Sequence, residues 1–417
     1  KFSTRNPETE NKIKELIKDD FNSITLGHEL SGKLNFYRRI NTCFLNESLK
    51  NNFILFSNYI EKSIKLLGIN SEINILKADG GIMSLKAAKT YVVETIFSGP
   101  SASLMGMLSL KKYQEDSILI DIGGTTTDIF FLADGIPLFE PLGTEINKYK
   151  TLIRSIFSKS LPLGGNTGFI VENGILKIDF KSSNKPLSLG GKKITLTDVF
   201  NYLNNINVGD IDKSISGLKE LSKQLNLDVN KTSKLIVNTF INLIKDKINN
   251  LINQINSKPI FTIKELLLNK QLKPNNITII GAPALSLKPY FKDTFNLDVF
   301  VPTKYYDVTN AIGSALAITT TEVNLYANTY LGKLNISELN KTIKINKDFN
   351  LSNAKELAIK YLKDEVKNLG GIPKELEYEI TLAEEYNMVK GFYTSGKNIR
   401  VKAQVKPGLI KGVRFYD

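Results

Sequence analysis

Two aspartates flank a short run of glycines and threonines in the stretch Asp121-Ile-Gly-Gly-Thr-Thr-Thr-Asp128. Apolar residues precede and follow this stretch, a pattern that predicts two strands joined by a tight turn. Because glycine has no Cβ, the amides of Gly123 and Gly124 can approach an anion closely and form a nest for it. An ordinary Gly-Gly hairpin is the alternative, and two acids at this spacing favour the phosphate site.

The polar side chains of the same stretch indicate which anion it takes. Thr125, Thr126 and Thr127 add hydroxyl donors to the glycine amides. Asp121 and Asp128 would repel a phosphate unless one carboxylate held a divalent cation and the other oriented water. The stretch therefore predicts a site for a nucleotide with Mg²⁺, with one of the two aspartates as the metal ligand and both Asp121 and Asp128 as catalytic candidates.

The sequence contains two further glycine-bearing turns. One contains Gly164 and Gly165 ahead of a predicted hairpin, and the other contains Gly281 and Ala282 between a short apolar strand and a helix. A strand, a small-residue turn and a helix N-terminus make a backbone cradle that can hold phosphates or a nucleoside. Each turn is a weak signal by itself.

The type and order of these motifs resemble those of the hydantoinase A and 5-oxoprolinase family. That family belongs to the superfamily of actin, sugar kinases and heat-shock chaperone ATPases, and the central stretch is similar to the superfamily's second phosphate loop. Besides that loop, the resemblance is carried by Arg5-Asn-Pro-Glu8, His28-Glu-Leu-Ser-Gly32, Asp79-Gly-Gly-Ile-Met-Ser84, Phe97-Ser-Gly-Pro-Ser-Ala102, Leu163-Gly-Gly165, Gly281-Ala-Pro-Ala284 and Asn310-Ala-Ile-Gly313.

The resemblance implies an α/β fold of the ribonuclease-H-like, actin-like ATPase kind with two lobes. We expect the rest of a first lobe at residues 1–112 and a second lobe at 113–322, with a helical insertion at about 196–256. The family also has an earlier Asp-Gly-Gly-Thr loop that has no counterpart in this sequence, so the first lobe is expected to be incomplete. Either the chain is a fragment, or the opposite wall of the cleft comes from elsewhere.

The remaining elements follow from sequence patterns. Apolar residues at helical spacing predict long helices at 35–67 and 232–255. From residue 323 onward the resemblance thins, and one amphipathic helix at 352–369 among extended segments predicts a small C-terminal α+β unit at 323–417. The last strands are expected at 377–383, 388–393 and 399–405.

Several residues outside the central stretch gain expected roles from the resemblance. His28 becomes a candidate catalytic residue, although a lone histidine is more often a structural hydrogen bonder. Asp79-Gly80-Gly81 is either a simple turn or part of a cleft. The expected cofactor contacts beyond the central stretch are Gly164, Gly165, Gly281, Ala282, Asn310 and Gly313, the last two in a segment that resembles an interdomain connection.

The activity implied by the resemblance is ATP-dependent opening of a cyclic amide or imide, of the hydantoin or 5-oxoproline type. ATP and Mg²⁺ would be the cofactors, with Asp121 as the metal ligand, and a second, hydantoinase B-type subunit would be a partner; homo-oligomerisation stays open. Two other functions keep the same loop: a nucleotide-switched scaffold or assembly protein, and a kinase that phosphorylates a small molecule. Phosphate release that depends on a cyclic amide would distinguish the first function from both alternatives.

Composition excludes several other classes. The net charge of +13 comes from lysines scattered along the chain, without a basic run longer than two residues or an arginine-rich arm, so we do not expect nucleic acid as a partner. Cys43 and His28 are the only residues of their types, which excludes an internal disulfide and a Cys/His zinc site. No apolar run is long enough to cross a membrane, and a cytoplasmic location is the default expectation.

Overall fold

The computed structural model describes residues 3–4, 6–140, 142–180, 185–204, 206–257, 271–336, 338–339 and 341–410. These residues divide into two compact units. The first unit comprises the described residues of 1–101, 139–156 and 314–413, and the second those of 102–138 and 157–313. The chain passes between the units inside two helices, α5 (Ser98–Leu110) and α11 (Thr309–Leu316). The division into three domains predicted above stays a prediction.

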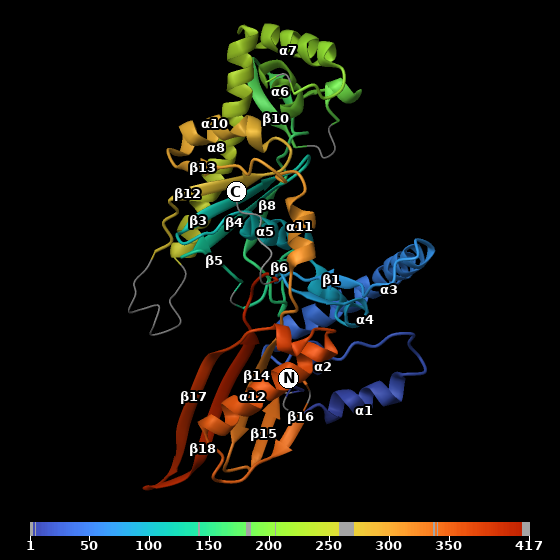
Figure 1. Cartoon of the computed structure of the whole chain (residues 1–417), viewed down its shortest axis with the longest axis vertical. Coiled ribbons are helices and arrows are strands. Elements are labelled where there is room, and N and C mark those ends of the chain that lie inside the picture. The colour runs from blue at the N-terminus through green and yellow to red at the C-terminus, as the bar shows by residue number, and fades with distance from the viewer. Residues whose placement is uncertain are drawn as a thin grey trace. The chain divides into compact units, whose positions relative to one another are not determined.

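A mixed sheet forms the centre of the second unit, with strands in the order β13-β12-β3-β4-β5 and β8 paired to β4 (Figure 1). β3 and β4 are antiparallel, whereas β12 lies parallel to β3 on its other side. Antiparallel hairpins followed by parallel strands are the arrangement expected of a ribonuclease-H-like lobe. The strands are β3 (Ser117–Ile122), β4 (Thr127–Ala133), β5 (Ile136–Pro137), β8 (Ser158–Leu161), β12 (Asn276–Ile280) and β13 (Asp298–Phe300).

The two faces of this sheet bury different residues because side chains alternate along a strand. Ile118, Ile120 and Ile122 point into the main apolar core, which helices α6, α7, α8 and α10 complete. Leu119 and Asp121 point to the opposite face. The helices are α6 (Leu196–Asn204), α7 (Ile211–Leu225), α8 (Val229–Asn256) and α10 (Ala284–Phe295), and a small sheet beside them contains β9 (Gly168–Glu172), β10 (Ile175–Asp179) and β11 (Ile194–Thr195), with η2 (Leu187–Leu189) nearby.

Helices α5 and α11 cross within the second unit at two glycines. A Cβ added to Gly106 would lie 1.9 Å from the Thr309 carbonyl oxygen, and one added to Gly313 would lie 1.9 Å from the Ala102 carbonyl oxygen. Backbone therefore packs directly against backbone at this crossing.

This crossing predicts a large effect for a small substitution. Gly106→Ala forces the two helices apart, so we expect the free energy of unfolding to fall by about 2–3 kcal/mol. Gly99→Ala is the matched control on α5, because an added Cβ there meets nothing within 4 Å. Urea unfolding of both variants measures the difference, and equal stability of the two would contradict the tight crossing.

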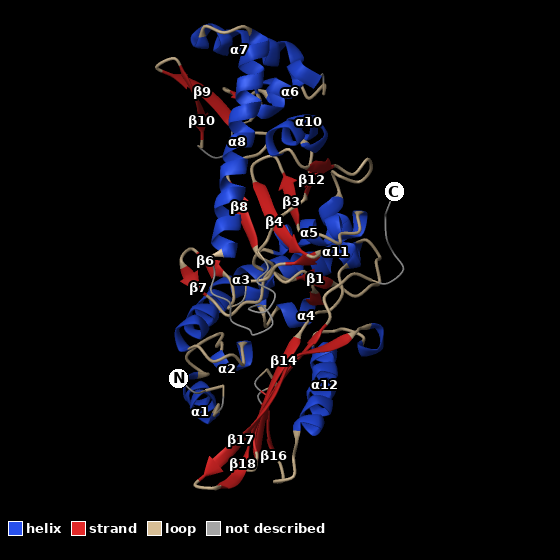
Figure 2. Ribbon diagram, turned by 90° about the vertical axis from the view of Figure 1, so that its left-hand side faces the viewer, coloured by secondary structure: helices blue, strands red, loops and turns tan. Residues whose placement is uncertain are grey.

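In the first unit, α12 covers one face of an antiparallel sheet with strands in the order β16-β15-β14-β18-β17 (Figure 2). Ala354, Ala358 and Leu362 of the helix are fully buried against Leu325 and Val401 of the sheet. Asn350 begins the helix with a reciprocal capping box. The elements are β14 (Glu322–Asn328), β15 (Lys333–Ile336), β16 (Lys341–Lys344), α12 (Leu351–Asn368), η3 (Pro373–Glu375), β17 (Tyr378–Lys390) and β18 (Tyr393–Val405).

The strand boundaries predicted for the C-terminal region were wrong. The three predicted strands are two long strands, β17 and β18, joined by a tight turn at Gly391, whose φ is 64°. Their length was hidden because the polar residues from Glu384 to Asn387 pair with β18 without being buried in the core. A strand that gains its hydrogen bonds from one neighbour needs no alternating apolar pattern.

The rest of the first unit is built around a long helix, α3. Its most buried side chains are polar: Arg39, Thr42, Asn46 and Ser57. Asn46 accepts from the Val93 amide and donates to the Thr90 carbonyl. The predicted apolar stripe is therefore largely exposed, with Phe44 at 70%. The elements are α1 (Glu8–Ile17), α2 (Gly27–Leu30), α3 (Phe36–Leu66), β1 (Asn74–Leu76), β2 (Ile82–Ser84), α4 (Leu85–Ala88), η1 (Val92–Thr95), β6 (Glu145–Ile146) and β7 (Tyr149–Lys150).

Among the helices that the structure describes, none combines the length and the apolar character that a bilayer crossing requires.

Candidate functional site

The central stretch folds as the predicted hairpin between β3 and β4. Asp121 and Asp128 are directly opposite each other in the antiparallel register, so both carboxylates leave the same face of the sheet. The Gly123 amide donates to the Thr126 carbonyl at 2.9 Å and closes the turn. Gly124, Thr125 and Thr126 at its tip are exposed. The hairpin thus presents two glycines and two exposed threonines beside a pair of acids.

The second glycine-rich turn packs directly against this hairpin. The Gly165 amide donates to the Gly123 carbonyl at 2.9 Å, and the Asn166 amide donates to the Gly124 carbonyl at 2.7 Å. A Cβ on Gly164 would lie 2.6 Å from the Gly123 carbonyl oxygen, so glycine is required for this approach. The structure therefore brings together two turns that the sequence separates by about forty residues.

Thr127 helps to hold the two turns together. Its side chain is fully buried, and its hydroxyl donates to the Leu163 carbonyl at 2.7 Å. This hydroxyl is engaged inside the protein, whereas those of Thr125 and Thr126 are at the exposed tip. The phosphate contact predicted for Thr127 stays a prediction.

The third predicted turn closes the cluster at Gly281. This residue has a φ of 95°, and a Cβ on it would lie 2.1 Å from the Ile122 carbonyl oxygen and 3.0 Å from Oδ1 of Asp121. Ala282 follows it and is exposed ahead of α10. The strand, turn and helix predicted here are confirmed, and they place this turn beside Asp121.

The two aspartates lie in an environment that disfavours their negative charge. Burial raises the pKa of Asp121, although the Ser103 hydroxyl donates to its Oδ2 at 2.6 Å. Burial also raises the pKa of Asp128, with a hydrogen bond from Ser160 opposing the shift and the nearby Asp121 charge adding to it. A cation beside both carboxylates would relieve this penalty, because opposite charge favours the ionised form.

The acids therefore fit the predicted magnesium, but they do not form a complete protein cage. Among the described residues no group of three or more His, Cys, Asp or Glu side chains could hold a metal ion. Mg²⁺ is typically bound through one or two carboxylates, with water and substrate phosphates as its other ligands. One or both aspartates, with phosphate oxygens, satisfy that requirement.

Three other predicted site residues have structural contacts of their own, and their predicted roles stay predictions. Gly313 is buried where α11 crosses α5, and the backbone of α5 packs directly against it. Asn310 is exposed near the start of α11, and its Oδ1 accepts from the Ala311 amide. His28 belongs to the first unit, where it is 1% exposed and its Nδ1 lies 2.7 Å from Oε2 of Glu10.

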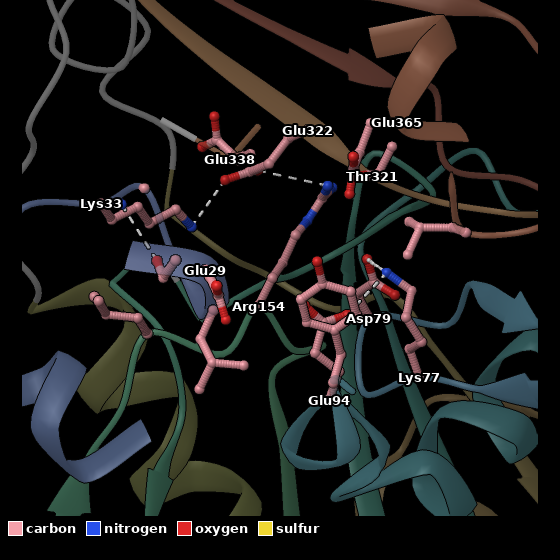
Figure 3. A pocket seen from close by; sticks show the side chains of 16 residues that line it. Glu29, Lys33, Lys77, Asp79, Glu94, Arg154, Thr321, Glu322, Glu338 and Glu365 are labelled. Carbon is pink, nitrogen blue, oxygen red and sulfur yellow. Dashed lines mark hydrogen bonds and ion pairs between the residues drawn. The ribbon is translucent and has the colours of Figure 1, made fainter. Parts of the chain in front are cut away.

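The first unit contains a pocket of about 90 Å³ with an unusual density of charge (Figure 3). The residues that line it come from α2, the loop after β1, η1, the segment around Arg154, β14 and α12, among others. The charged residues that line it are Glu29, Lys33, Lys77, Asp79, Glu94, Arg154, Glu322, Glu338 and Glu365.

Lys77 and Asp79 are the most deeply buried ions of this pocket. The Lys77 ammonium donates to the Thr320 carbonyl at 2.8 Å and lies 3.3 Å from Oε2 of Glu94. Asp79 accepts from the Thr320 hydroxyl at 2.8 Å and from the Gly81 amide at 3.1 Å. Burial opposes both charges, but their mutual attraction raises the pKa of Lys77 and lowers that of Asp79. Asp79 is thus part of a pocket wall as well as a turn.

Glu322 forms ion pairs with the remaining cations. Its carboxylate lies 2.9 Å from Lys33, 2.9 Å from Lys402 and 3.6 Å from Arg154. Burial would raise the pKa of Glu322, but these cations lower it to about 2.

This network predicts a pH-dependent contribution to stability. A fall of the Glu322 pKa from 4.5 to about 2 corresponds to roughly 3 kcal/mol. Because the folded pKa is depressed, this stability is present above pH 4.5 and is lost as the pH falls towards 2. We expect Glu322→Gln to lower the free energy of unfolding by that amount at neutral pH and by little at pH 2. Urea unfolding across this range measures it, with exposed Glu375→Gln as control, and a loss independent of pH would contradict the assignment.

Sequence reasoning did not predict this pocket, although Glu29 and Asp79 lie in two of the segments that carry the family resemblance. The other charged residues come from segments that are far apart in the chain and belong to none of these motifs. A weak signal existed in Lys77, which directly follows an apolar strand and precedes Asp79 by two residues. A charge at the end of a buried strand often marks a paired ion.

Together, the ribonuclease-H-like sheet and the glycine-rich hairpin between paired aspartates define an α/β protein of the actin-like ATPase fold. The sequence profile of the family described as Hydantoinase/oxoprolinase matches residues 39–323, which is more than half of the chain. The chain belongs to this family, and the resemblance inferred from its motifs is confirmed.

Two solved structures show the same fold. The nucleotide-free structure of an acetone carboxylase, from work on ATP-dependent acetone carboxylation, matches with a TM-score of 0.63 and 15% identity over 97% of this chain and 63% of the other. An ATP-dependent caprolactamase from Pseudomonas jessenii matches with a TM-score of 0.65 and 14% identity over 99% of this chain and 64% of the other. The chain therefore spans less than two thirds of the length of these two proteins. A search of curated proteins finds no match.

Proposed function

We propose that this protein is the nucleotide-binding component of an ATP-dependent enzyme that opens a cyclic amide or imide of the hydantoin or 5-oxoproline type. The observation that carries the proposal is the hairpin tip, where Gly123, Gly124 and two exposed threonines lie beside the Asp121–Asp128 pair. Membership of the hydantoinase/oxoprolinase family supports the choice of reaction.

In this proposal the amide of Gly124 and the hydroxyls of Thr125 and Thr126 bind the ATP phosphates, and Gly123, whose amide is bonded to the Thr126 carbonyl, shapes the turn that presents them. Mg²⁺, held by Asp121, would neutralise phosphate charge when bound. Asp128 orients the attacking water or the substrate. The neighbouring turns at Gly164 and Gly281 hold the hairpin in place, so the donors are preorganised and need little rearrangement during the reaction.

The proposed reaction activates a poor electrophile. The amide carbonyl oxygen attacks the γ-phosphorus of ATP, and the bond between that phosphorus and the ADP oxygen breaks. Water then adds to the activated carbon, the ring C–N bond breaks with a proton passing to nitrogen, and a second water releases the phosphate. The net products are the ring-opened amino acid, ADP and inorganic phosphate.

A second subunit of the hydantoinase B type is proposed as the partner that carries out the hydrolytic steps. The exposed apolar side chains of α3 support a partner, because Tyr37, Phe44 and Tyr59 are each at least 70% exposed. Solvent-facing aromatic residues at this density are typical of interfaces.

Phosphate release tests the proposed function most simply. With the partner subunit present, hydantoin or 5-oxoproline should stimulate phosphate release from ATP several-fold, whereas proline, which has the same ring size but no amide carbonyl, should not. Slow ATP turnover whose rate none of the three compounds changes would indicate a nucleotide-switched scaffold instead. A stable phosphorylated product would indicate a small-molecule kinase.

A further inference from the structure

The charged pocket of the first unit has more carboxylates than cations. Six acids and three bases line it among the described residues. In a partly enclosed site this excess of negative charge acts strongly on a ligand, because water screens the charges less than at an open surface. The imbalance indicates what kind of ligand the pocket accepts.

The three cations of the pocket are already paired with carboxylates. Lys77 lies between Asp79 and Glu94, and Lys33 and Arg154 both lie beside Glu322. An anionic ligand would have to compete with these carboxylates for the same cations. The pocket is therefore poorly suited to a carboxylate or phosphate ligand.

One donor of the pocket lacks an acceptor. Nη1 of Arg154 is buried without a hydrogen-bond partner among the described residues, although it lies 3.6 Å from Oε2 of Glu322. In Figure 3 the Arg154 side chain extends through the middle of the pocket. A buried guanidinium N–H without an acceptor costs free energy, so a ligand oxygen at this point would be favourable.

At Tyr91, Glu94 and Glu365 the pocket instead offers acceptors that a hydrogen-bond donor of the ligand could use. Glu365 is 7% exposed, and its Oε2 accepts from the side-chain Nδ2 of Asn368 at 3.0 Å. Burial raises the pKa of Glu365, and burial together with the charges of Glu365, Glu94 and Glu29 holds the pKa of Tyr91 far above its usual value. These carboxylates lie close together and have acceptor capacity for ligand N–H groups.

We propose that this pocket binds a small uncharged molecule that gives a carbonyl oxygen to Arg154 and N–H donors to Glu365 and its neighbours, and that it discriminates against carboxylate ligands. An amide or urea group has this combination of donor and acceptor. Rejection comes from the excess of negative charge, since like charges brought together without solvent cost several kcal/mol. The residues that line the pocket belong to the first unit, whereas the hairpin residues belong to the second unit.

The proposal deepens the proposed function because it selects neutral cyclic amides over 5-oxoproline, and it can fail independently. Binding to this pocket requires neither nucleotide nor turnover. A chain that binds neutral amides but does not hydrolyse ATP would contradict the proposed function alone. A chain with amide-stimulated ATP hydrolysis but no effect of pocket variants would contradict this proposal alone.

The test compares two ligands that share one ring. Saturation-transfer NMR with the full chain, without nucleotide, measures the affinities of 2-pyrrolidinone and 5-oxoproline, which differ only by a carboxylate. We expect 2-pyrrolidinone to bind at least about tenfold more tightly. Equal affinities, tighter binding of 5-oxoproline, or binding of neither ligand would overturn the proposal.

Variants then locate the binding. Glu365→Gln should weaken 2-pyrrolidinone binding about tenfold and reduce the preference over 5-oxoproline, because it removes a charged acceptor. Glu356→Gln on the exposed side of the same helix is the matched control and should change neither affinity. If Glu365→Gln does not fold, Tyr91→Phe removes a hydroxyl from the same wall and should also weaken binding. Unchanged affinities in folded pocket variants would overturn the assignment.

Discussion

Asp121→Asn should reduce magnesium-dependent ATP turnover by about a hundredfold or more, the usual effect of removing one preorganised electrostatic contact to a reacting phosphate. The substitution keeps the shape of the side chain and an oxygen that can accept from Ser103. It removes the charge that would bind the cation. Turnover assays at saturating Mg²⁺ measure the loss.

The fold of this variant should be intact, which makes the result interpretable. Burial raises the pKa of Asp121, so the charged form is disfavoured in the folded protein without nucleotide. An uncharged asparagine should therefore not lower stability. Asp134→Asn, at the exposed turn at the other end of β4, is the matched control and should leave turnover unchanged. Normal hydrolysis by Asp121→Asn would show that this carboxylate does not hold the metal.

The largest loss of stability is expected for Asp198→Asn in the second unit. Asp198 is fully buried, and its carboxylate accepts from the amides of Leu187, Ser188 and Thr195 at 2.9–3.0 Å. The hydroxyls of Thr195 and Ser214 also donate to it. The Asp198 carboxylate thus links three elements: η2, the start of α6, and α7.

An amide at this position turns an NH₂ group towards donors and removes the negative charge that satisfies them. We expect the free energy of unfolding to fall by about 3–4 kcal/mol. Asp246→Asn on the exposed side of α8 should change it by less than about 0.5 kcal/mol. Urea unfolding compares the two, and similar stabilities would mean that Asp198 is not the centre of this network.

Local sequence patterns predicted the hairpin because the residues that determine it are consecutive in the chain. Apolar runs on either side of Gly123 and Gly124 determine two adjacent strands, and the structure confirms the turn between them. The contact between this turn and Gly164 could not be read from the sequence, because it depends on how β8 pairs with β4. The family resemblance supplied that proximity as an expectation.

Long-range ion pairs were beyond prediction for a different reason. Glu322 meets Lys33 and Lys402, which are distant from it in sequence, and charged residues at such positions are usually solvated. The long helix α3 was predicted in extent but not in burial. Its apolar stripe suggested a core-facing helix, whereas Asn46 and Thr42 make the inward contacts through hydrogen bonds.

The central claim is that the Gly124 amide and the exposed threonine hydroxyls of the hairpin tip bind the phosphates of ATP. The most direct measurement is a two-dimensional NMR titration of ¹⁵N-glycine-labelled protein with ATP and Mg²⁺, which detects weak binding as well as tight binding. The account predicts shifts of the Gly123 and Gly124 amides, with smaller shifts at Gly164 and Gly165 and none at Gly370 in the first unit. Saturating nucleotide that leaves the Gly123 and Gly124 signals in place would contradict it.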